Sequence, residues 1–365
     1  MVLKICFFIP SLENGGAERV VSLLANELCV EHDINILMLN EKKSDYYIDP
    51  RVKLVPFNCV IDREHKGLLL KIEIIYNELK RIYKYCRFIN KYKPDAIISM
   101  LYTTNIIAIL SNYYLKKRLI VSERNDPTQY SEIRQKIIKK LYPKAEVLVC
   151  QSKKVAQYFE SKNTRVIYNP IVNLIQSENK KNKNGGRIRV ISVGRLIEQK
   201  NHELLINAVH NLALSGIDCD LDIYGEGPLR NKLQQLINSF EMNDNIKLRG
   251  FSKSIKQKLR CYDLFVLSSN FEGFPNVMVE AMSCDLPVVS SNFATGIAEE
   301  LISESVNGYL FNVGDENGLI LCLKKCIEEG FDTAKLHSFN VGKLSQFDVA
   351  KISKQWIEEC KERRR

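Results

Sequence analysis

Short apolar runs rich in β-branched residues alternate with longer amphipathic stretches along almost the whole of this 365-residue chain. Such short runs between polar turns are typical of buried strands, whereas the longer stretches carry apolar residues at helical spacing. In the first half we expect strands at 4–9, 34–39, 96–100, 119–122 and 146–150, with helices at 17–30, 71–91 and 153–160. This rhythm predicts an α/β fold built on a parallel, doubly wound sheet.

The rhythm stops and then restarts near the middle of the chain. A polar stretch rich in Lys, Asn and Gly follows residue 170 and has the composition of a solvated linker. A second series is expected, with strands at 189–193, 220–224, 245–248, 264–267 and 287–290 and helices at 202–214, 229–240, 276–283 and 316–329. We predict Rossmann-like domains at 1–170 and 188–345, a linker at 171–187, and a terminal helix within 346–365 that can cross back onto the first domain. Ligands of open parallel sheets bind beyond the carboxyl ends of the strands, so two such domains facing a central cleft would carry their chemistry in those loops.

The composition argues against several other classes of protein. The chain is 45% hydrophobic and 26% charged, as globular domains are. Its eleven cysteines are scattered without a Cys-x-x-Cys pair, which favours a reduced, cytoplasmic protein over a disulfide framework or a zinc ribbon. The apolar run within the first ten residues is too short for a signal peptide. No uncharged apolar run approaches the length of a membrane-spanning helix.

Glycine turns follow three of the expected strands. Gly15 and Gly16 open directly into the first helix, Gly194 ends the strand at 189–193, and Gly225 follows the strand at 220–224. Glycine lets backbone approach a ligand closely, and a helix N-terminus offers free N–H groups to phosphate or hydroxyl oxygens. The first turn lacks the spacing of a dinucleotide fingerprint, and an ordinary strand-to-helix turn is an open alternative there.

Two cations lie directly after the first strand of the second domain. Arg195 follows Gly194, and Lys200 comes five positions later. An arginine fork and a lysine point charge can converge on one anion, and a diphosphate leaving group suits that pair. The alternative is that both are ordinary solvated surface cations.

The passage from residue 268 to residue 289 is the most specific in the chain. A strand ends, a Glu-Gly turn follows, and a proline stands where a first helical residue tolerates the loss of its N–H. Backbone amides there can bind sugar hydroxyls or phosphate, and the two glutamates can accept hydrogen bonds from diols. The candidate residues are Glu272, Gly273, Phe274, Pro275, Asn276 and Glu280.

Three aspartates at alternate positions imitate the Asp-x-Asp metal clamp of some nucleotide-sugar enzymes. Asp218, Asp220 and Asp222 alternate with Cys219 and Leu221. Such alternation is also the pattern of the polar face of a strand, which is the interpretation we favour. We therefore predict no metal site and no cofactor.

With these motifs in view, residues 3–330 resemble the family 4 retaining glycosyltransferases of GT-B architecture. Glu272 to Glu280 matches the family's Glu-x7-Glu motif, Arg195 to Lys200 its Arg-x4-Lys, Gly15–Gly16 its N-terminal donor loop, and Asp222–Gly227 its Gly-x-Gly turn. The resemblance implies a UDP-sugar donor held mainly by the second domain. Arg195 and Lys200 would bind the diphosphate, Glu280 the ribose, and Glu272 with the backbone of 273–276 the transferred sugar. It also implies a metal-independent displacement with retention, in which the departing phosphate helps to deprotonate the acceptor.

One position departs from the family pattern. Relatives often carry a histidine where Arg124 stands, and that histidine contacts the donor sugar or the acceptor. We predict that Arg124, together with Glu18, binds the acceptor; an ion pair of Arg124 with Glu123 or Asp126 is the alternative.

The opening residues and the length most resemble bacterial enzymes that extend lipid-linked O-antigen, capsule or glycoprotein glycans. We therefore expect a hexose or N-acetylhexosamine to pass from a UDP-sugar to an undecaprenyl-diphosphate-linked saccharide. A nucleotide-sugar epimerase of similar architecture is the alternative enzyme, and a basic nucleic-acid-binding protein is an alternative of another class. No helix-turn-helix, zinc-finger or aromatic RNA-binding signature supports the latter.

The net charge of +10 is not spread evenly. Residues 71–170 hold 20 Lys and Arg against 8 Asp and Glu, whereas residues 171–365 are neutral. The stretch 71–93 mixes cations with Ile74, Ile75, Tyr76, Tyr83 and Phe88, as an interfacial helix does. We predict a peripheral protein whose first domain faces the anionic inner leaflet of a bacterial plasma membrane, with an ordinary solvated helix packed on the sheet as the alternative.

Overall fold

The computed structural model describes residues 1–13, 15–41, 43–59, 67–171 and 187–361, and the chain divides into two compact units. Unit 1 consists of Met1–Val172 and Phe347–Arg365, and unit 2 of Asn173–Gln346. The last helix, α13 (Val349–Cys360), therefore belongs to unit 1 although it follows unit 2 in the sequence. The predicted linker, 171–187, lies outside the described residues except for its two ends.

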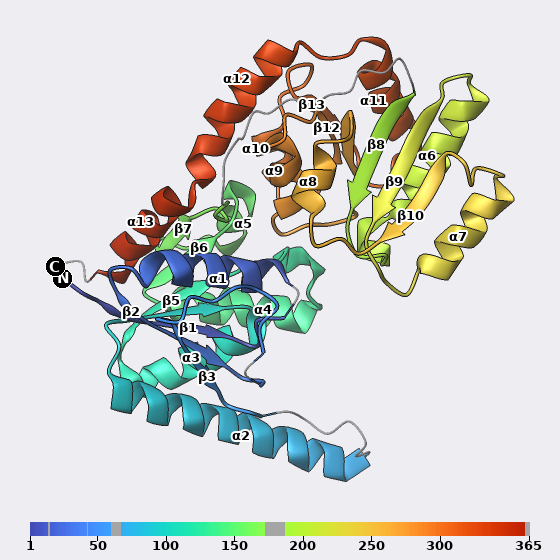
Figure 1. Ribbon diagram of the computed structural model, residues 1–365. Helices are drawn as coiled ribbons and strands as arrows, with labels where there is room; N and C mark the ends of the chain where they lie inside the picture. Colours follow the sequence, from blue (N-terminus) through green and yellow to red (C-terminus); the bar gives the residue numbers. More distant parts are fainter. Residues whose placement is uncertain (14, 42, 60–66, 172–186, 362–365) are drawn as a thin grey trace. The chain divides into compact units, whose positions relative to one another are not determined.

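Unit 1 is built on a sheet of seven parallel strands in the order β3-β2-β1-β4-β5-β6-β7 (Figure 1). The strand order reverses between β1 and β4, which makes that point the topological switch of the sheet. The strands are β1 (Lys4–Ile9), β2 (Asp33–Met38), β3 (Lys53–Pro56), β4 (Ala96–Met100), β5 (Arg118–Ser122), β6 (Val147–Cys150) and β7 (Thr164–Val166).

Helices cover both faces of this sheet. Alternate residues of each strand point to opposite faces, so they belong to two different hydrophobic cores. Ile5 and Phe7 of β1 belong to one core, with α1 and α13, whereas Cys6 and Phe8 belong to the other, with α2 and α3. The helices of unit 1 are α1 (Gly16–Leu28), α2 (Gly67–Tyr92), α3 (Tyr102–Leu115), α4 (Glu132–Leu141), α5 (Lys153–Phe159) and α13.

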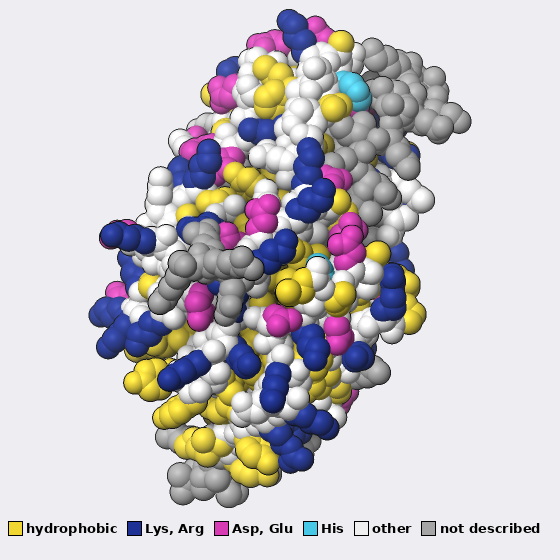
Figure 2. Space-filling view, turned by 90° about the vertical axis from the view of Figure 1, so that its left-hand side faces the viewer, with side chains coloured by type: hydrophobic (Ala, Val, Ile, Leu, Met, Phe, Trp, Pro, Cys, Tyr) yellow, Lys and Arg dark blue, Asp and Glu magenta, His cyan; other side chains and the backbone are white. Residues whose placement is uncertain are grey.

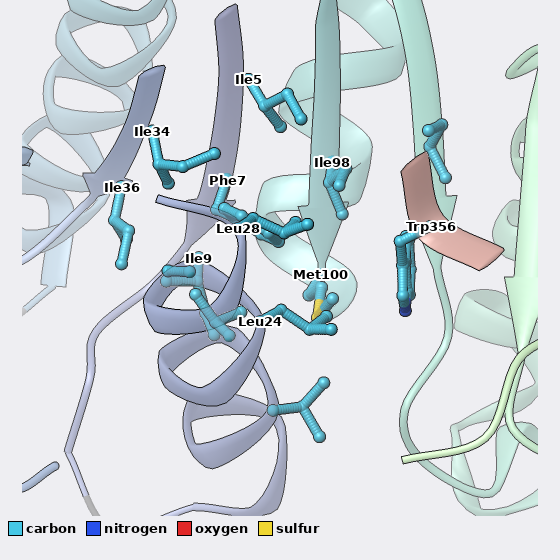
Figure 3. Packing of buried hydrophobic residues seen from close by; sticks show 14 of the residues in the cluster. Ile5, Phe7, Ile9, Leu24, Leu28, Ile34, Ile36, Ile98, Met100 and Trp356 are labelled. Atoms are coloured by element: carbon cyan, nitrogen blue, oxygen red, sulfur yellow. The ribbon is translucent and has the colours of Figure 1, made fainter. Parts of the chain in front are cut away.

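The single tryptophan of the chain, Trp356, lies in the first of these cores (Figure 3). It is fully buried, and Ile352 and Cys360 of α13 are buried beside it in the same cluster. The C-terminal helix thus completes the hydrophobic core of unit 1.

Unit 2 is built on six parallel strands in the order β10-β9-β8-β11-β12-β13, with the switch between β8 and β11. The strands are β8 (Ile188–Val193), β9 (Cys219–Tyr224), β10 (Ile246–Gly250), β11 (Leu264–Leu267), β12 (Val288–Ser291) and β13 (Gly308–Phe311). The helices are α6 (His202–Leu214), α7 (Arg230–Ser239), α8 (Ile255–Leu259), α9 (Asn276–Met282), α10 (Ile297–Leu301), α11 (Glu316–Glu328) and α12 (Thr333–Leu344).

The predicted strands and helices all occur, with ends that differ by a few residues. Sequence reasoning missed β3, β7 and β13, which have only three or four residues each, and the short helices α8 and α10. It also missed α3, α4 and α12. No helix within the described ranges is long and apolar enough to cross a membrane.

A buried carboxyl group fixes the loop that follows β5. Oε1 of Glu123 accepts the backbone N–H groups of Arg124 and Asn125, both at 2.9 Å, and the hydroxyl of Tyr130 at 3.2 Å. Glu123 is fully buried, and this desolvation raises the pKa of its carboxyl to about 7, although the hydrogen bonds oppose the shift. Its Oε2 has no hydrogen-bond partner in the described part of the chain, so glutamine at this position loses no hydrogen bond of that atom.

We predict that Glu123→Gln removes a pH dependence from the stability of unit 1. The folded carboxyl has a pKa of about 7 against an ordinary value of 4.5, so it binds the additional proton between these values. Its contribution to stability is present below the lower value and is lost as the pH rises towards 7, by about 3 kcal/mol at most. Denaturant unfolding followed by Trp356 fluorescence at several pH values measures this slope. Glu132→Gln, at an exposed position of α4, is the control, and an unchanged slope in Glu123→Gln would contradict the prediction.

Candidate functional site

The loops that follow β8 and β11 carry the charged residues predicted for the donor site. These two strands are neighbours at the switch point of unit 2, so their carboxyl ends meet at the same edge of the sheet. Arg195 and Lys200 come from the loop after β8, and Glu272 comes from the loop after β11.

An ion pair joins the two loops. Nζ of Lys200 lies 2.5 Å from Oε1 of Glu272, and the two side chains are only 15% and 8% exposed. Ser269 Oγ donates a second hydrogen bond to the same carboxylate oxygen at 2.6 Å, and Thr295 Oγ1 donates to the backbone oxygen of Glu272 at 3.0 Å. The carboxylate and the ammonium group are therefore held in place before any ligand arrives.

The backbones of the two loops are also tied to each other. Ser268 Oγ donates to the carbonyl oxygen of Lys200 at 3.0 Å, and the backbone N–H of Asn270 donates to the carbonyl oxygen of Gln199 at 2.8 Å. Gln199 Nε2 donates in return to the carbonyl oxygen of Phe271 at 2.9 Å. The position of Lys200 relative to Glu272 is thus a property of both loops.

Close backbone packing explains the glycines of this edge. Gly225 follows β9 with φ +146°, and a Cβ there would lie 1.8 Å from the carbonyl oxygen of Gly194. A Cβ on Gly194 would come within 3.0 Å of the aliphatic part of the Lys200 side chain. Gly225 needs glycine because backbone atoms already occupy the space of a side chain, whereas a side chain at Gly194 would require the Lys200 side chain to shift.

Arg195 differs from Lys200 in its surroundings. It is exposed, and its side chain makes no hydrogen bond or ion pair within the described part of the chain; its carbonyl oxygen accepts the backbone N–H of Ile197 at 2.9 Å. His202 follows nearby at the start of α6, where burial and the charge of Lys200 lower its imidazole pKa to about 4. The imidazole is therefore neutral near pH 7, and the positive charge of this edge comes from Lys200 and Arg195.

The remaining predicted donor residues lie at the start of α9. Pro275 precedes its first residue, Asn276, and Phe274 and Glu280 are 7% and 6% exposed. Gly273 is half-buried. Glu280 lies in α9, eight positions after Glu272 in the sequence.

The other predicted residues belong to unit 1. Gly15 and Gly16 begin α1 directly after β1, and the Tyr46 hydroxyl both donates to the oxygen of Gly15 at 2.8 Å and accepts its N–H at 3.1 Å. Glu18 lies in the first turn, with its carboxylate against Gly15. Tyr46 is thus a positioning residue that the sequence did not suggest, because it comes from a distant loop.

Arg124 is buried in unit 1. Its Nη1 donates to Oδ1 of Asn169 at 2.8 Å, and desolvation lowers its guanidinium pKa to about 10, so it remains charged near pH 7. Within the described ranges it forms no ion pair with Glu123 or Asp126, whose oxygens bind backbone amides instead. The ion-pair alternative was therefore wrong.

The aspartates of the possible metal clamp lie on or beside β9, as the strand interpretation predicted. Asp222 binds Arg249 Nε at 2.7 Å and also accepts the hydroxyl of Tyr262, while Asp218 pairs with Arg187 at 3.1 Å. No group of potential metal ligands occurs in the described part of the chain.

Sequence reasoning missed the residues that hold Glu272. Ser269 lies three positions before it in the motif and could have been considered as a partner. Thr295 comes from the loop after β12, and no sequence pattern connects it to Glu272.

Comparison with curated proteins shows relatives over almost the whole chain. The chain is 30% identical over 344 residues to the N-acetylgalactosamine-N,N'-diacetylbacillosaminyl-diphospho-undecaprenol 4-alpha-N-acetylgalactosaminyltransferase of Campylobacter jejuni, covering 89% of this chain and 90% of the relative. It is 26% identical over 310 residues to the amylovoran biosynthesis glycosyltransferase AmsD of Erwinia amylovora, covering 81% and 83%.

Solved structures show the same architecture. HepE from Anabaena, in complex with UDP and glucose, matches with a TM-score of 0.80 and 21% identity over 98% of both chains. The lipopolysaccharide outer core galactosyltransferase WaaB matches with a TM-score of 0.74 and 18% identity, again over 98% of both. The fold class is therefore GT-B, as the sequence predicted.

Two family models match this chain, one in each half of the sequence. The "Glycosyltransferase Family 4" model matches residues 14–172, and the "Glycosyl transferases group 1" model matches residues 175–338. Taken with the relatives above, they show that this chain belongs to family 4 of the GT-B glycosyltransferases.

Proposed function

We propose that this glycosyltransferase moves a hexose or N-acetylhexosamine from a UDP-sugar to an undecaprenyl-diphosphate-linked glycan during the synthesis of a bacterial surface polysaccharide. The observation that carries the proposal is the Lys200–Glu272 ion pair at the switch point of unit 2, with the exposed Arg195 five positions before Lys200. The names of the Campylobacter and Erwinia relatives support the acceptor and the pathway, and the UDP complex of HepE supports the donor.

Each group at this edge has a chemical task in the proposed reaction. The bond between the sugar C1 and the diphosphate oxygen breaks, and a bond from C1 to the acceptor oxygen forms on the same face of the sugar. The acceptor proton passes to the departing diphosphate. Arg195 and Lys200 stabilise the negative charge that develops on this leaving group, so no metal ion is required.

The carboxylates orient the donor. Glu272 is fixed by Lys200 and Ser269, so its oxygens are directed before the sugar binds, and this removes part of the ordering cost of binding. Glu280 binds the ribose, while the backbone of 273–276 contacts the transferred sugar. In unit 1, the loop of Gly15 and Gly16 completes donor binding and Glu18 contributes to the acceptor side.

The alternatives from the sequence have less support. Both family models and the relatives named above are glycosyltransferases, so an epimerase is not favoured.

Removing either cation or Glu272 is expected to stop sugar transfer and leave the fold intact. We expect Lys200→Ala, Arg195→Ala and Glu272→Ala each to lower the transfer rate by about 10²–10³-fold, because each removes a preorganised charge from the reacting centre. Transfer is measured with a panel of UDP- and GDP-sugars and undecaprenyl-diphosphate-linked acceptors, and circular dichroism checks the fold.

A surface ion pair of the same unit provides the matched control. Lys232 pairs with Glu203 at 2.6 Å, but both side chains are exposed, so Lys232→Ala should transfer sugar normally. Normal turnover by all three site variants would refute the assignment.

We further propose that unit 1 docks peripherally on the inner face of the bacterial plasma membrane. One face of α2 packs on the unit through Tyr85 and Ile89, but a second apolar stripe faces outward. Ile75, Leu79 and Tyr83, at intervals of four residues, are 61%, 62% and 61% exposed. A helix of a water-soluble domain does not need such a second stripe.

The neighbouring helix α3 also carries exposed apolar residues. α3 packs against α2, and Leu110, Tyr113 and Tyr114 near its end are exposed, followed by Lys116 and Lys117. In the lower part of Figure 2, which belongs to unit 1, yellow apolar side chains are interleaved with dark-blue cations. Aromatic and aliphatic groups among cations suit an anionic bilayer surface, where each cation contributes about 1 kcal/mol.

Vesicle binding tests this docking surface. We expect the wild-type chain to sediment with vesicles that contain phosphatidylglycerol, and less at high salt. The triple variant Ile75→Ser, Leu79→Ser, Tyr83→Ser should bind at least about tenfold more weakly, because three apolar side chains no longer enter the interface. Leu214→Ser with Leu321→Ser, at exposed positions of unit 2, is the control. Binding that ignores lipid charge, salt and the triple substitution would overturn it.

A further inference from the structure

The side chain of Arg124 touches two separate segments of unit 1. Beyond the hydrogen bond to Asn169, its Nη1 approaches the carbonyl oxygen of Ile167 at 3.5 Å, and its Cζ lies 5.3 Å from the ring centroid of Trp356. Asn169 and Ile167 follow β7, and Trp356 belongs to α13. The side chain is 6% exposed, so it is enclosed by these segments.

These segments lie where the chain leaves unit 1 and returns to it. The backbone N–H of Ile171 donates to the carbonyl oxygen of Phe347 at 2.8 Å, and the rings of Tyr168 and Phe347 meet edge to face at 5.1 Å. The segment that leaves unit 1 and the segment that returns to it are therefore joined to each other. Arg124 contacts the leaving segment at Asn169 and the returning helix, α13, at Trp356.

The backbone of Arg124 is fixed as firmly as its side chain. Its N–H donates to Glu123 Oε1, and its carbonyl oxygen accepts from Gln151 Nε2 at 2.8 Å. Glu123 also binds the N–H of Asn125, as described above. The guanidinium and the backbone of the loop 123–127, at the carboxyl end of β5, are therefore held by one connected set of buried contacts.

Joining segments through a buried cation has a large desolvation cost. Its Nε and Nη2 are buried without a hydrogen-bond partner among the residues described, and an apolar side chain of similar volume is often no less stabilising at such a place. An apolar side chain cannot supply the directional hydrogen bond to Asn169 or the cation–π contact of the guanidinium with Trp356.

We propose that Arg124 is a positioning residue for the acceptor side of the reaction, which holds the loop 123–127 in register with α13 and Asn169 and does not touch the acceptor itself. The inference rests on the proposed function, because it assumes that the acceptor binds at the carboxyl edge of unit 1. It replaces the direct acceptor contact that the sequence suggested.

Trp356 makes this junction visible, since it is the only tryptophan of the chain. In Arg124→Met we expect a changed Trp356 emission and stronger quenching by acrylamide. UDP affinity should stay within about twofold, and kcat should fall by about 10–100-fold while KM for the acceptor stays within about threefold, as expected for misplacement without loss of a contact. Arg124→Lys keeps the charge but not the planar guanidinium, and its kcat and Trp356 emission should lie between those of the wild type and of Arg124→Met.

Two further variants sharpen the test. Asn169→Ala should lower kcat in the same way, and the double variant Arg124→Met, Asn169→Ala should be less impaired than the sum of the single effects. Arg134→Met is the matched control, because Arg134 also stacks on a ring, that of Tyr102 at 5.1 Å, but is exposed on α4. It should leave Trp356 emission and kcat unchanged.

The opposite result is equally clear. A tenfold or larger rise in the acceptor KM with unchanged kcat and Trp356 emission would mean that Arg124 contacts the acceptor, and additive effects of Arg124 and Asn169 would also overturn the proposal. If Arg124→Met does not fold, the same comparison is made with Arg124→Lys and Asn169→Ala. A wild-type chain that neither binds UDP nor transfers sugar refutes the proposed function instead, whereas the coupling of Arg124 to Asn169 is still measured by Trp356 fluorescence.

Discussion

The geometry of the candidate site depends on one constraint, the reversal of strand order between β8 and β11 in unit 2. At that point the loops after two adjacent parallel strands begin at the same edge of the sheet, which is where ligands of open parallel sheets bind. Lys200 and Glu272, 72 positions apart in the sequence, meet there as an ion pair that is almost completely buried. Buried pairs cost desolvation energy, so its value lies in holding two charges in a fixed direction more than in stability.

The glycines of this edge follow from the same constraint. Loops that must bring charged side chains together across a narrow edge pack backbone against backbone, and Gly225 against Gly194 is the tightest such contact. Ser269 and Thr295 then fix Glu272 from neighbouring segments. The result is a site whose charges are ordered in advance, which is the condition under which electrostatic groups accelerate a reaction.

Unit 1 uses a buried charge in another way. Glu123 and Arg124 are consecutive and buried, and each binds neutral partners: backbone amides for the carboxyl group, and Asn169 with Trp356 for the guanidinium. Because α13 returns to this unit, Trp356 lies beside a strand-end loop more than 200 residues earlier in the sequence. The outer face of the same unit carries cations and apolar residues on α2 and α3, which the core does not require.

The sequence by itself determined the alternation of strands and helices, the restart of that alternation, and the candidate residues after β8, β9 and β11. These features are local: apolar periodicity, glycine turns and a proline before a helix act over a few neighbouring residues. Only the tertiary structure decided that Lys200 binds Glu272, that Ser269, Thr295 and Tyr46 fix the motif residues, and that Arg124 is enclosed under Trp356 instead of being free as a surface cation. Those contacts join segments that are distant in the chain, and strand order and helix packing, which no local pattern encodes, bring them together.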